Sequence, residues 1–458
     1  MIRLSLTLVF LFSLTNLTKS STLSLEAWFA ASMKGESPSL EKLAIPSTDI
    51  AKTRQEVFTA YKDAATKSEW DKKFTPPNKL TAAADGKLSI KAGSYHIGKG
   101  LDMPYAVLEK GTKPEKGWPL IIAMHGGGGT GDKLATPHSW PVNTQEWNTQ
   151  IKLALGLYPN NAIYFVPRMV DDNRGRWWKE FNHTAFTAMI RHAILYWDVD
   201  PNRVYLLGIS EGGYGTETLA CRYPDPFAAA NGMACGEGTS IHVENLRNLP
   251  FRTDVGEKDT MFGRKPNAVA KHELLETYRK KDPEGYVNHL EIHPGKGHGI
   301  NYKPGPEWMM PFTRRTHPDR VTYTLFQHDG VKNKGAYWLL ATNDLDKKVI
   351  YLDARINTPE NSISITADAT KNDEIVQAAD WQKPLADSGE TIPASGLKLR
   401  LWLHESLLDL TKPISITING KLVETFTPQP DVATLCESLM LSGDPETTYA
   451  CKADVMVP

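Results

Sequence analysis

Short apolar runs alternate with helically spaced segments through the middle of the chain. Runs such as PLIIA (119–123) and RVYLLGIS (203–210) are each followed by segments whose apolar residues recur every three or four positions. Apolar strands separated by helices are typical of a mostly parallel sheet covered on both faces. The predicted strands lie at 88–97, 103–111, 119–126, 162–169, 203–210, 227–235, 251–259 and 287–295, with helices at 182–197, up to 222, and at 268–281. The pattern predicts an α/β fold.

The pattern changes on both sides of this domain. Residues 21–84 space their apolar positions in the helical manner, which predicts a mostly helical N-terminal segment. Residues 320–430 carry about seven strand-like runs separated by turn residues, the pattern of an antiparallel β-sandwich. We therefore predict an α/β domain at 85–312, an all-β sandwich-like domain at 320–430, and a polar C-terminal tail at 431–458. The sequence leaves open whether the N-terminal segment caps the active site or packs beneath the sheet.

The first residues have the pattern of a secretory signal peptide. One early arginine precedes an apolar stretch from Leu4 to Leu14, and small polar residues follow it. The stretch is shorter than the roughly 20 residues of a membrane-spanning helix, although a single anchor is the alternative. We predict a signal peptide at 1–20, a secreted or periplasmic location, and no membrane association after cleavage.

Composition narrows the class of partner. The chain of 458 residues is 41% hydrophobic, and its 52 basic and 53 acidic residues give a net charge of −1. A balanced charge leaves no net positive charge that would attract nucleic acid or an anionic membrane. We therefore expect a small or polymer-linked substrate, roughly neutral, and no nucleic-acid partner.

The four cysteines fit an exported protein but are too few for a dense disulfide framework. Cys436 and Cys451 bracket the polar tail, where a disulfide between them would be useful. Cys221 and Cys235 are expected at opposite ends of a helix and a strand, too far apart to be bridged. We interpret this second pair as buried thiols.

A candidate nucleophile lies at the junction of a predicted strand and helix. Residues 208–212 read Gly-Ile-Ser-Glu-Gly, a G-x-S-x-G pattern. Small residues two positions before and after the serine permit the strained turn that exposes its hydroxyl at the start of a helix. This context favours Ser210 as a nucleophile over a chance match.

A serine nucleophile needs a base and an acid that orients the base, and we look for both after Ser210 in the chain. FRTDVGEKD ends a predicted strand and offers Asp254, Glu257 and Asp259. Asp259 is our choice because it follows the strand, in the loop where such acids lie, whereas Asp254 lies within the strand. Glu257 stays an alternative.

Histidines follow in EIHPGKGHGI. Glycines on both sides of His298 predict an exposed loop at the carboxyl edge of the sheet, from which the ring can reach the serine. His293, at the end of the predicted strand, is the alternative base.

Four consecutive glycines follow His125 directly after a predicted central strand. The segment matches neither a P-loop nor a dinucleotide-binding fingerprint, and a linker does not fit its position after a buried strand. Backbone amides in such a loop can stabilise an oxyanion together with the amide after the nucleophile. We predict Gly127 and Glu211 as the donors, with Gly126 and Gly128 as alternatives to Gly127.

The motifs MHGGGG, GISEGGYG, GEKDTMF and HPGKGHG, in this order, resemble the α/β-hydrolase superfamily. The resemblance is to its secreted esterase branch, which includes polyhydroxybutyrate-depolymerase-like, feruloyl and acetylxylan esterases; prolyl-oligopeptidase catalytic domains are also similar. It covers roughly residues 85–312. It implies Ser210 as nucleophile, Asp259 as orienting acid, His298 as base, and Gly127 with Glu211 as oxyanion donors. Neither a metal nor an organic cofactor is implied.

The segment DDNRGRWWKEF supplies candidate substrate-binding residues. Arg176, Trp177 and Trp178, with Arg174, follow a strand on the predicted catalytic edge and could line a pocket. The alternative is that the tryptophans anchor a surface loop to the core.

The chemistry thus predicts a serine hydrolase that cleaves carboxylic esters. A prolyl-oligopeptidase-like peptidase is an alternative, but fewer than about 90 upstream residues cannot form that family's β-propeller. The other alternative is a non-catalytic polysaccharide-binding or adhesion protein with a degenerate hydrolase domain. The C-terminal domain could contact polysaccharide in either case.

Overall fold

The computed structural model describes residues 23–79, 90–98, 100–127, 142–170, 177–237, 241–345, 348–371 and 390–458. The predicted signal peptide lies outside the described residues, as do Arg174, Arg176 and Gly128.

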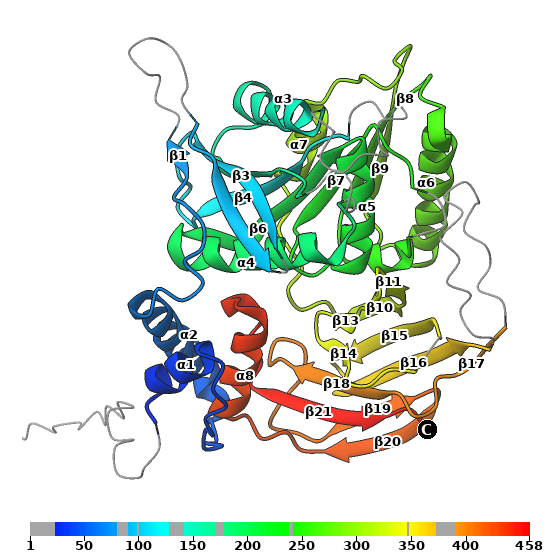
Figure 1. The fold of residues 1–458 in the computed structure, drawn as a ribbon. Helices are drawn as coiled ribbons and strands as arrows, with labels where there is room; N and C mark the ends of the chain where they lie inside the picture. The colour runs from blue at the N-terminus through cyan, green and yellow to red at the C-terminus, as the bar shows by residue number, and fades with distance from the viewer. Residues whose placement is uncertain are drawn as a thin grey trace, which may run out of the picture.

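A nine-stranded sheet forms the centre of the α/β domain (Figure 1). Its strands are β1 (Asn78–Lys79), β2 (Gly93–Gly98), β3 (Leu101–Lys110), β4 (Trp118–Met124), β5 (Ala162–Pro167), β6 (Val199–Ile209), β7 (Ala229–Met233), β8 (Phe251–Gly256) and β9 (Asn288–His293). The order is β1-β3-β5-β4-β6-β7-β8-β9, with β2 paired to β3. Only β3 runs antiparallel to its neighbours β2 and β5. The predicted α/β fold with a mostly parallel sheet is confirmed.

Helices cover both faces of this sheet because both faces of its strands are apolar. Leu120 and Ile122 of β4 share one core with helices α4, α5 and α6, whereas Ile121 and Ala123 share another with α3 and α7. The helices are α3 (Val142–Gly156), α4 (Glu180–Tyr196), α5 (Glu211–Arg222), α6 (Arg264–Lys281) and α7 (Pro304–Met309). The sequence pattern did not predict α3 or α7.

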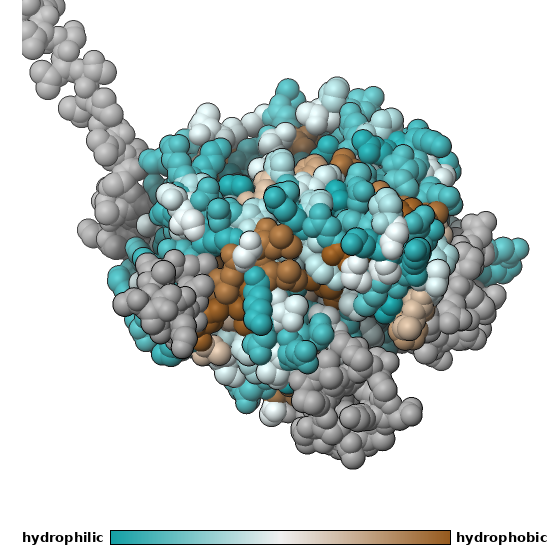
Figure 2. Space-filling model, turned by 90° about the horizontal axis from the view of Figure 1, so that it is seen from above, coloured by the Kyte–Doolittle hydropathy of each residue, from teal (hydrophilic) through white to brown (hydrophobic). Residues whose placement is uncertain are grey.

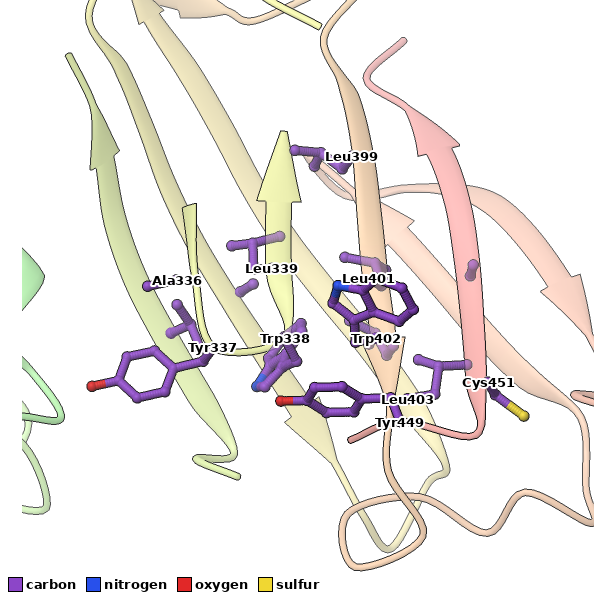
Figure 3. Packing of buried hydrophobic residues seen from close by; sticks show 14 of the residues in the cluster. Ala336, Tyr337, Trp338, Leu339, Leu399, Leu401, Trp402, Leu403, Tyr449 and Cys451 are labelled. Atoms are coloured by element: carbon purple, nitrogen blue, oxygen red, sulfur yellow. The ribbon is translucent and has the colours of Figure 1, made fainter. Parts of the chain in front are cut away.

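Two further sheets enclose one core in the C-terminal part of the chain. The first contains β10 (Arg320–Leu325), β15 (Ile350–Asn357), β16 (Ser362–Thr370), β17 (Thr391–Pro393), β19 (Ile414–Ile418) and β20 (Lys421–Phe426). The second contains β13 (Gly335–Ala336), β14 (Leu339–Ala341), β18 (Lys398–Leu403) and β21 (Cys451–Met456), and a hairpin joins β11 (Gln327–His328) to β12 (Val331–Lys332). Figure 3 shows Trp338, Trp402 and Tyr449 packed together in this core. We call residues 320–458 the β domain.

One pair of the sandwich departs from the antiparallel prediction. Strands β16 and β19 are parallel. Parallel neighbours need a crossover connection, and the chain makes one here by passing through β18 in the other sheet before it returns as β19.

The predicted polar tail is part of the β domain. It forms α8 (Val432–Ser442), a 3-10 turn at Pro445–Thr447, and β21, the edge strand beside β18. Leu435 and Leu439 are fully buried in the shared core. Apolar packing therefore holds this segment, which corrects the prediction of a tail without a core.

Cys436 and Cys451, whose pairing the sequence left open, are not bridged, and all four cysteines are free and buried. Burial raises the pKa of the Cys436 and Cys451 thiols to about 12. Both thiols therefore stay protonated and poorly reactive near neutral pH. Cys221 and Cys235 are buried thiols, as predicted.

The N-terminal segment is helical and packs against α8 of the β domain, which settles a position that the sequence left open. Helix α1 (Leu25–Met33), a 3-10 turn (Ser47–Asp49) and α2 (Ile50–Lys67) lie beside α8 (Figure 1). Phe29, Val57 and Tyr61 belong to the core of the β domain. The apolar faces of α1 and α2 are thus covered by the last part of the chain. Sequence periodicity shows that these faces are apolar, but not which distant segment covers them.

Figure 2 shows the molecule turned by 90° from the view of Figure 1, so that it is seen from above. Hydrophilic residues cover most of this face, and hydrophobic residues gather in one area of it. Such a mixture is usual for the outside of a globular domain.

Among the described residues, no helix combines the length and the apolar character needed to cross a membrane.

A stacked pair of histidines, one buried and one partly buried, makes the stability of the fold sensitive to acid. The rings of His317 and His404 stack with centroids 3.6 Å apart, and burial lowers the pKa of both to about 3. An exposed imidazole has a pKa of about 6.5, so each ring gains a proton on unfolding at acidic pH. Their contribution to stability is complete above about pH 6.5 and is lost as the pH falls toward 3.

Each such ring should remove about 2 kcal/mol from the free energy of unfolding between pH 7.5 and 5.0. Between pH 7.5 and 5.0, the free energy of unfolding of His404→Gln should fall by about 2 kcal/mol less than that of the wild type. Urea unfolding at both pH values measures this difference. His289→Gln, at a half-exposed histidine, should behave as the wild type does. Equal losses in His404→Gln and the wild type would contradict the prediction.

Candidate active site

Ser210 lies in a strained turn between β6 and α5. Its φ of 54° and ψ of −112° are rare for a residue with a side chain. The turn is held by hydrogen bonds from the Ser210 amide to the Met233 carbonyl (2.7 Å) and from the Tyr214 amide to the Ser210 carbonyl (3.0 Å). A Cβ at position 208 would collide with the backbone of Gly212. The spacing of the glycines is therefore a steric requirement of the turn.

His298 lies between Ser210 and Asp259. Its Nε2 is 2.9 Å from the Ser210 Oγ, and its Nδ1 is 2.7 Å from the Asp259 Oδ2. The imidazole is 45% exposed, whereas the carboxylate is 2% exposed. The structure thus brings together the three residues that the sequence singled out from separate loops.

A residue that the sequence did not indicate holds the buried carboxylate. Arg264, at the start of α6, donates from Nη1 to the Asp259 Oδ1 (3.0 Å) and from Nε to the Tyr214 hydroxyl (3.2 Å). Each oxygen of Asp259 therefore has its own donor. The arginine follows Asp259 by five residues, and no motif marks it.

The alternative acids and base have other partners. Asp254 accepts hydrogen bonds from Arg252 (2.7 and 2.8 Å) and lies 3.1 Å from the His293 Nε2. Burial would raise the pKa of Asp254, but these hydrogen bonds bring it below its usual value. Glu257 accepts from the Gly295 amide (2.7 Å). Among the described residues, none of these three side chains forms a hydrogen bond with Ser210 or His298.

The His125 ring holds the first glycines of the glycine-rich segment. The Met169 amide donates to its Nε2 (3.0 Å), so the ring proton lies on Nδ1, which donates to the Gly126 carbonyl (2.7 Å). Burial lowers the pKa of His125 to about 3, which keeps the ring neutral. Because the peptide is planar and trans, the Gly127 N–H points away from the ring.

The two described glycines flank the nucleophile turn. A Cβ at Gly126 would lie 3.5 Å from the Ser210 Cβ, and one at Gly127 would collide with the Glu211 carboxylate. Glu211 is the first residue of α5, where helix amides have no acceptor within the helix. The Gly126–Gly127 segment and the start of α5 therefore lie next to Ser210.

Trp177 does not line a pocket. Its side chain is completely buried, and the indole N–H donates to the His125 carbonyl (2.9 Å). This corrects its predicted role in substrate binding and agrees with the anchoring alternative, because a residue without exposed surface cannot contact substrate. Trp178 is partly exposed and stays a candidate, whereas Arg176 lies outside the described residues.

A second carboxylate, which the sequence analysis did not single out, lies beside the glycines. Glu146 of α3 is partly buried, and a Cβ at Gly126 would be 3.0 Å from its Oε2. Burial raises the pKa of this carboxyl, although the nearby His298 opposes the shift. No sequence motif marks Glu146, because α3 itself was not predicted.

The arrangement contains groups that acyl transfer to a serine uses. A histidine that accepts from a hydroxyl and donates to a buried carboxylate can remove the hydroxyl proton. Backbone amides beside the hydroxyl can receive negative charge on a substrate oxygen. Among the described residues, no group of His, Cys, Asp and Glu side chains could hold a metal ion.

Comparisons with known proteins point to esterases. A 79-residue segment is 29% identical to an acetylxylan esterase of Coprinopsis cinerea, covering 17% of this chain and 20% of that protein. A segment of 132 residues is 28% identical to feruloyl esterase B of Neurospora crassa, covering 27% of this chain and 40% of that protein. The chain thus spans less than half the length of either relative. No protein-family model matches.

Solved structures of esterases are also similar in part. A thermostable esterase matches 49% of this chain and 63% of its own, with 21% identity and a TM-score of 0.35. The feruloyl esterase module from Clostridium thermocellum matches 54% of this chain and 99% of its own, with 13% identity and a TM-score of 0.33. The mostly parallel sheet and the serine between β6 and α5 give the domain the α/β-hydrolase fold predicted from the sequence.

Proposed function

We propose that the protein is a serine hydrolase that cleaves carboxylic esters through an acyl-enzyme intermediate. The proposal is carried by the hydrogen bonds that place His298 between Ser210 and Asp259, at 2.9 and 2.7 Å. The similarity of two segments to esterases supports the same class of reaction.

In acylation, the Ser210 Oγ attacks the carbonyl carbon of the ester while the His298 Nε2 takes its proton. The Asp259 carboxylate accepts from Nδ1 and stabilises the imidazolium that forms. His298 then gives the proton to the leaving alcohol, the carbon–oxygen bond of the ester breaks, and the acyl group stays on Ser210.

The negative charge that develops on the carbonyl oxygen is received by backbone amides. We assign these to Glu211, at the start of α5, and Gly127, whose peptide is oriented by His125. One such donor lowers the barrier by about 3 to 4 kcal/mol. Water then attacks the acyl-enzyme, with His298 again as base, and releases the carboxylic acid.

The similarity to an acetylxylan esterase suggests acetyl esters on a polysaccharide as substrates. We propose small acyl groups on a sugar as the substrate class. With residues 1–20 as a signal peptide, the enzyme would be secreted or periplasmic and would meet such esters outside the cell.

Matched ester and amide substrates test the ester assignment. We expect the purified protein to hydrolyse p-nitrophenyl acetate and acetylated sugars, but not p-nitroacetanilide, above the rate without enzyme. A proline p-nitroanilide cleaved faster than the acetate would favour the peptidase alternative instead. Activity on neither class would support a non-catalytic binding protein.

A further inference from the structure

We propose that the β domain positions the glycine segment of the active site, with Asp329 of the β11–β12 hairpin as the positioning residue. This inference rests on the proposed function, because it assigns the Gly126–Gly127 peptide to the oxyanion site. It gives the β domain a role in the reaction that requires no contact with substrate.

The hairpin is fixed to the far end of the helix that begins at the nucleophile. Arg222, the last residue of α5, is almost completely buried. Its guanidinium donates to the carbonyls of His328 (3.0 Å) and Val331 (2.7 Å), one on each strand of the hairpin. Hydrogen bonds from a buried charged group to backbone are among the stronger ones in proteins, so the hairpin and α5 are held as one unit.

The tip of the hairpin caps another helix of the α/β domain. The Asp329 Oδ2 accepts from the Glu180 amide (3.0 Å), and its Oδ1 lies 2.6 Å from the Lys179 Nζ. Glu180 is the first residue of α4. A carboxylate at this place satisfies an unpaired helix amide and interacts favourably with the helix dipole. The β domain therefore supplies the cap that the α/β domain lacks at α4, since Lys179 makes no side-chain cap there.

The start of α4 in turn holds Trp177. The Asn182 side chain donates to the Trp177 carbonyl (3.2 Å), and the Trp177 Cβ lies against Gly215 of α5 so closely that an alanine there would collide with it. The buried indole N–H donates to the His125 carbonyl (2.9 Å), and the two rings meet edge to face with centroids 4.9 Å apart.

These contacts form a continuous path from the β domain to the oxyanion site. Asp329 fixes the first turn of α4, this turn fixes Trp177, Trp177 fixes His125, and His125 fixes the Gly126 carbonyl. Because Trp177 holds the His125 carbonyl and the His125 ring holds the Gly126 carbonyl, we expect a displacement of Trp177 to shift the glycine peptide. Losing the cap should therefore reduce kcat rather than substrate binding, because the oxyanion forms only during the reaction.

Asp329→Ala tests the proposal. We expect kcat for p-nitrophenyl acetate to fall about 5- to 20-fold, with KM within about twofold of the wild type. Asp329→Asn should keep most of the activity, because an amide oxygen still accepts from the Glu180 amide. The control is Asp353→Ala, which removes an ion pair with Arg320 in the β domain and should leave kcat unchanged.

A double-mutant cycle separates positioning from general destabilisation. If Asp329 acts through Trp177, then Asp329→Ala should slow the Trp177→Phe variant by no more than about twofold. Independent effects that multiply, or an Asp329→Ala variant with a lower Tm and unchanged kcat, would overturn the proposal.

Hydrogen exchange keeps this test independent of the proposed activity. Asp329→Ala should increase amide exchange in residues 120–127 by at least about threefold, while Asp353→Ala should not. Unchanged exchange would overturn the positioning role even in an active enzyme. A wild-type protein that hydrolyses no ester would overturn the proposed function instead. In that case the exchange result would still show whether the β domain holds residues 120–127 in place.

Discussion

Replacing Ser210 with alanine is expected to lower kcat for p-nitrophenyl acetate by about 10⁴- to 10⁶-fold. The change removes the atom that would form the acyl-enzyme, and the His298 Nε2 then has no hydroxyl to deprotonate. Residual turnover would come from the backbone amides alone. The fold should be unaffected, because among the described residues the Ser210 Oγ forms a hydrogen bond only with His298.

The matched control is Ser364→Ala, at an exposed serine on β16, which should keep wild-type kcat. Initial rates, corrected for hydrolysis without enzyme, and a thermal unfolding curve of each variant provide the comparison. A folded Ser210→Ala variant with more than about one tenth of the wild-type rate would exclude Ser210 as the nucleophile.

Replacing Asp259 with asparagine is expected to lower kcat by about 10³- to 10⁴-fold, with KM nearly unchanged. Arg264 donates to Oδ1, so the asparagine oxygen takes that position and its NH2 group faces the His298 Nδ1. Because an NH2 group donates, Nδ1 has to accept a hydrogen bond from it and cannot carry the ring proton. The proton therefore moves to Nε2. In this tautomer, His298 cannot take a proton from Ser210.

Glu257→Gln is the control for this substitution, since Glu257 was the alternative acid and contacts the Gly295 amide instead. We expect it to change kcat by less than about threefold. The assignment would be reversed if Glu257→Gln lost activity and Asp259→Asn kept it.

Local signals in the sequence predicted much of the fold and of the candidate site. Apolar runs of strand length were sufficient for β4 to β7, because these strands are largely buried on both faces. The turn at Ser210 depends on Gly208 and Gly212, whose spacing is visible in five residues. The order of serine, acid and histidine indicated which loops to compare, and the structure brings the chosen side chains together.

Contacts between distant segments could not be predicted in this way. Leu435 and Leu439 looked like part of a polar tail because their partners lie in α2 and the β domain. The sequence could not decide whether Trp177 lines a pocket or anchors a loop, because the carbonyl that its indole contacts is 52 residues earlier. Arg264 carries no motif, and its role depends on the geometry of the turn after β8. Periodicity reports which face is buried, but not what covers it.

Covalent labelling tests the central claim most directly. The protein is incubated with a fluorophosphonate, which phosphonylates an activated serine, and the modified peptide is located by mass spectrometry. We predict one label per chain, on Ser210, with labelling at least about 10²-fold slower in His298→Ala because the base is lost. A label on a different residue, or ester hydrolysis that continues while Ser210 stays unmodified, would contradict the account.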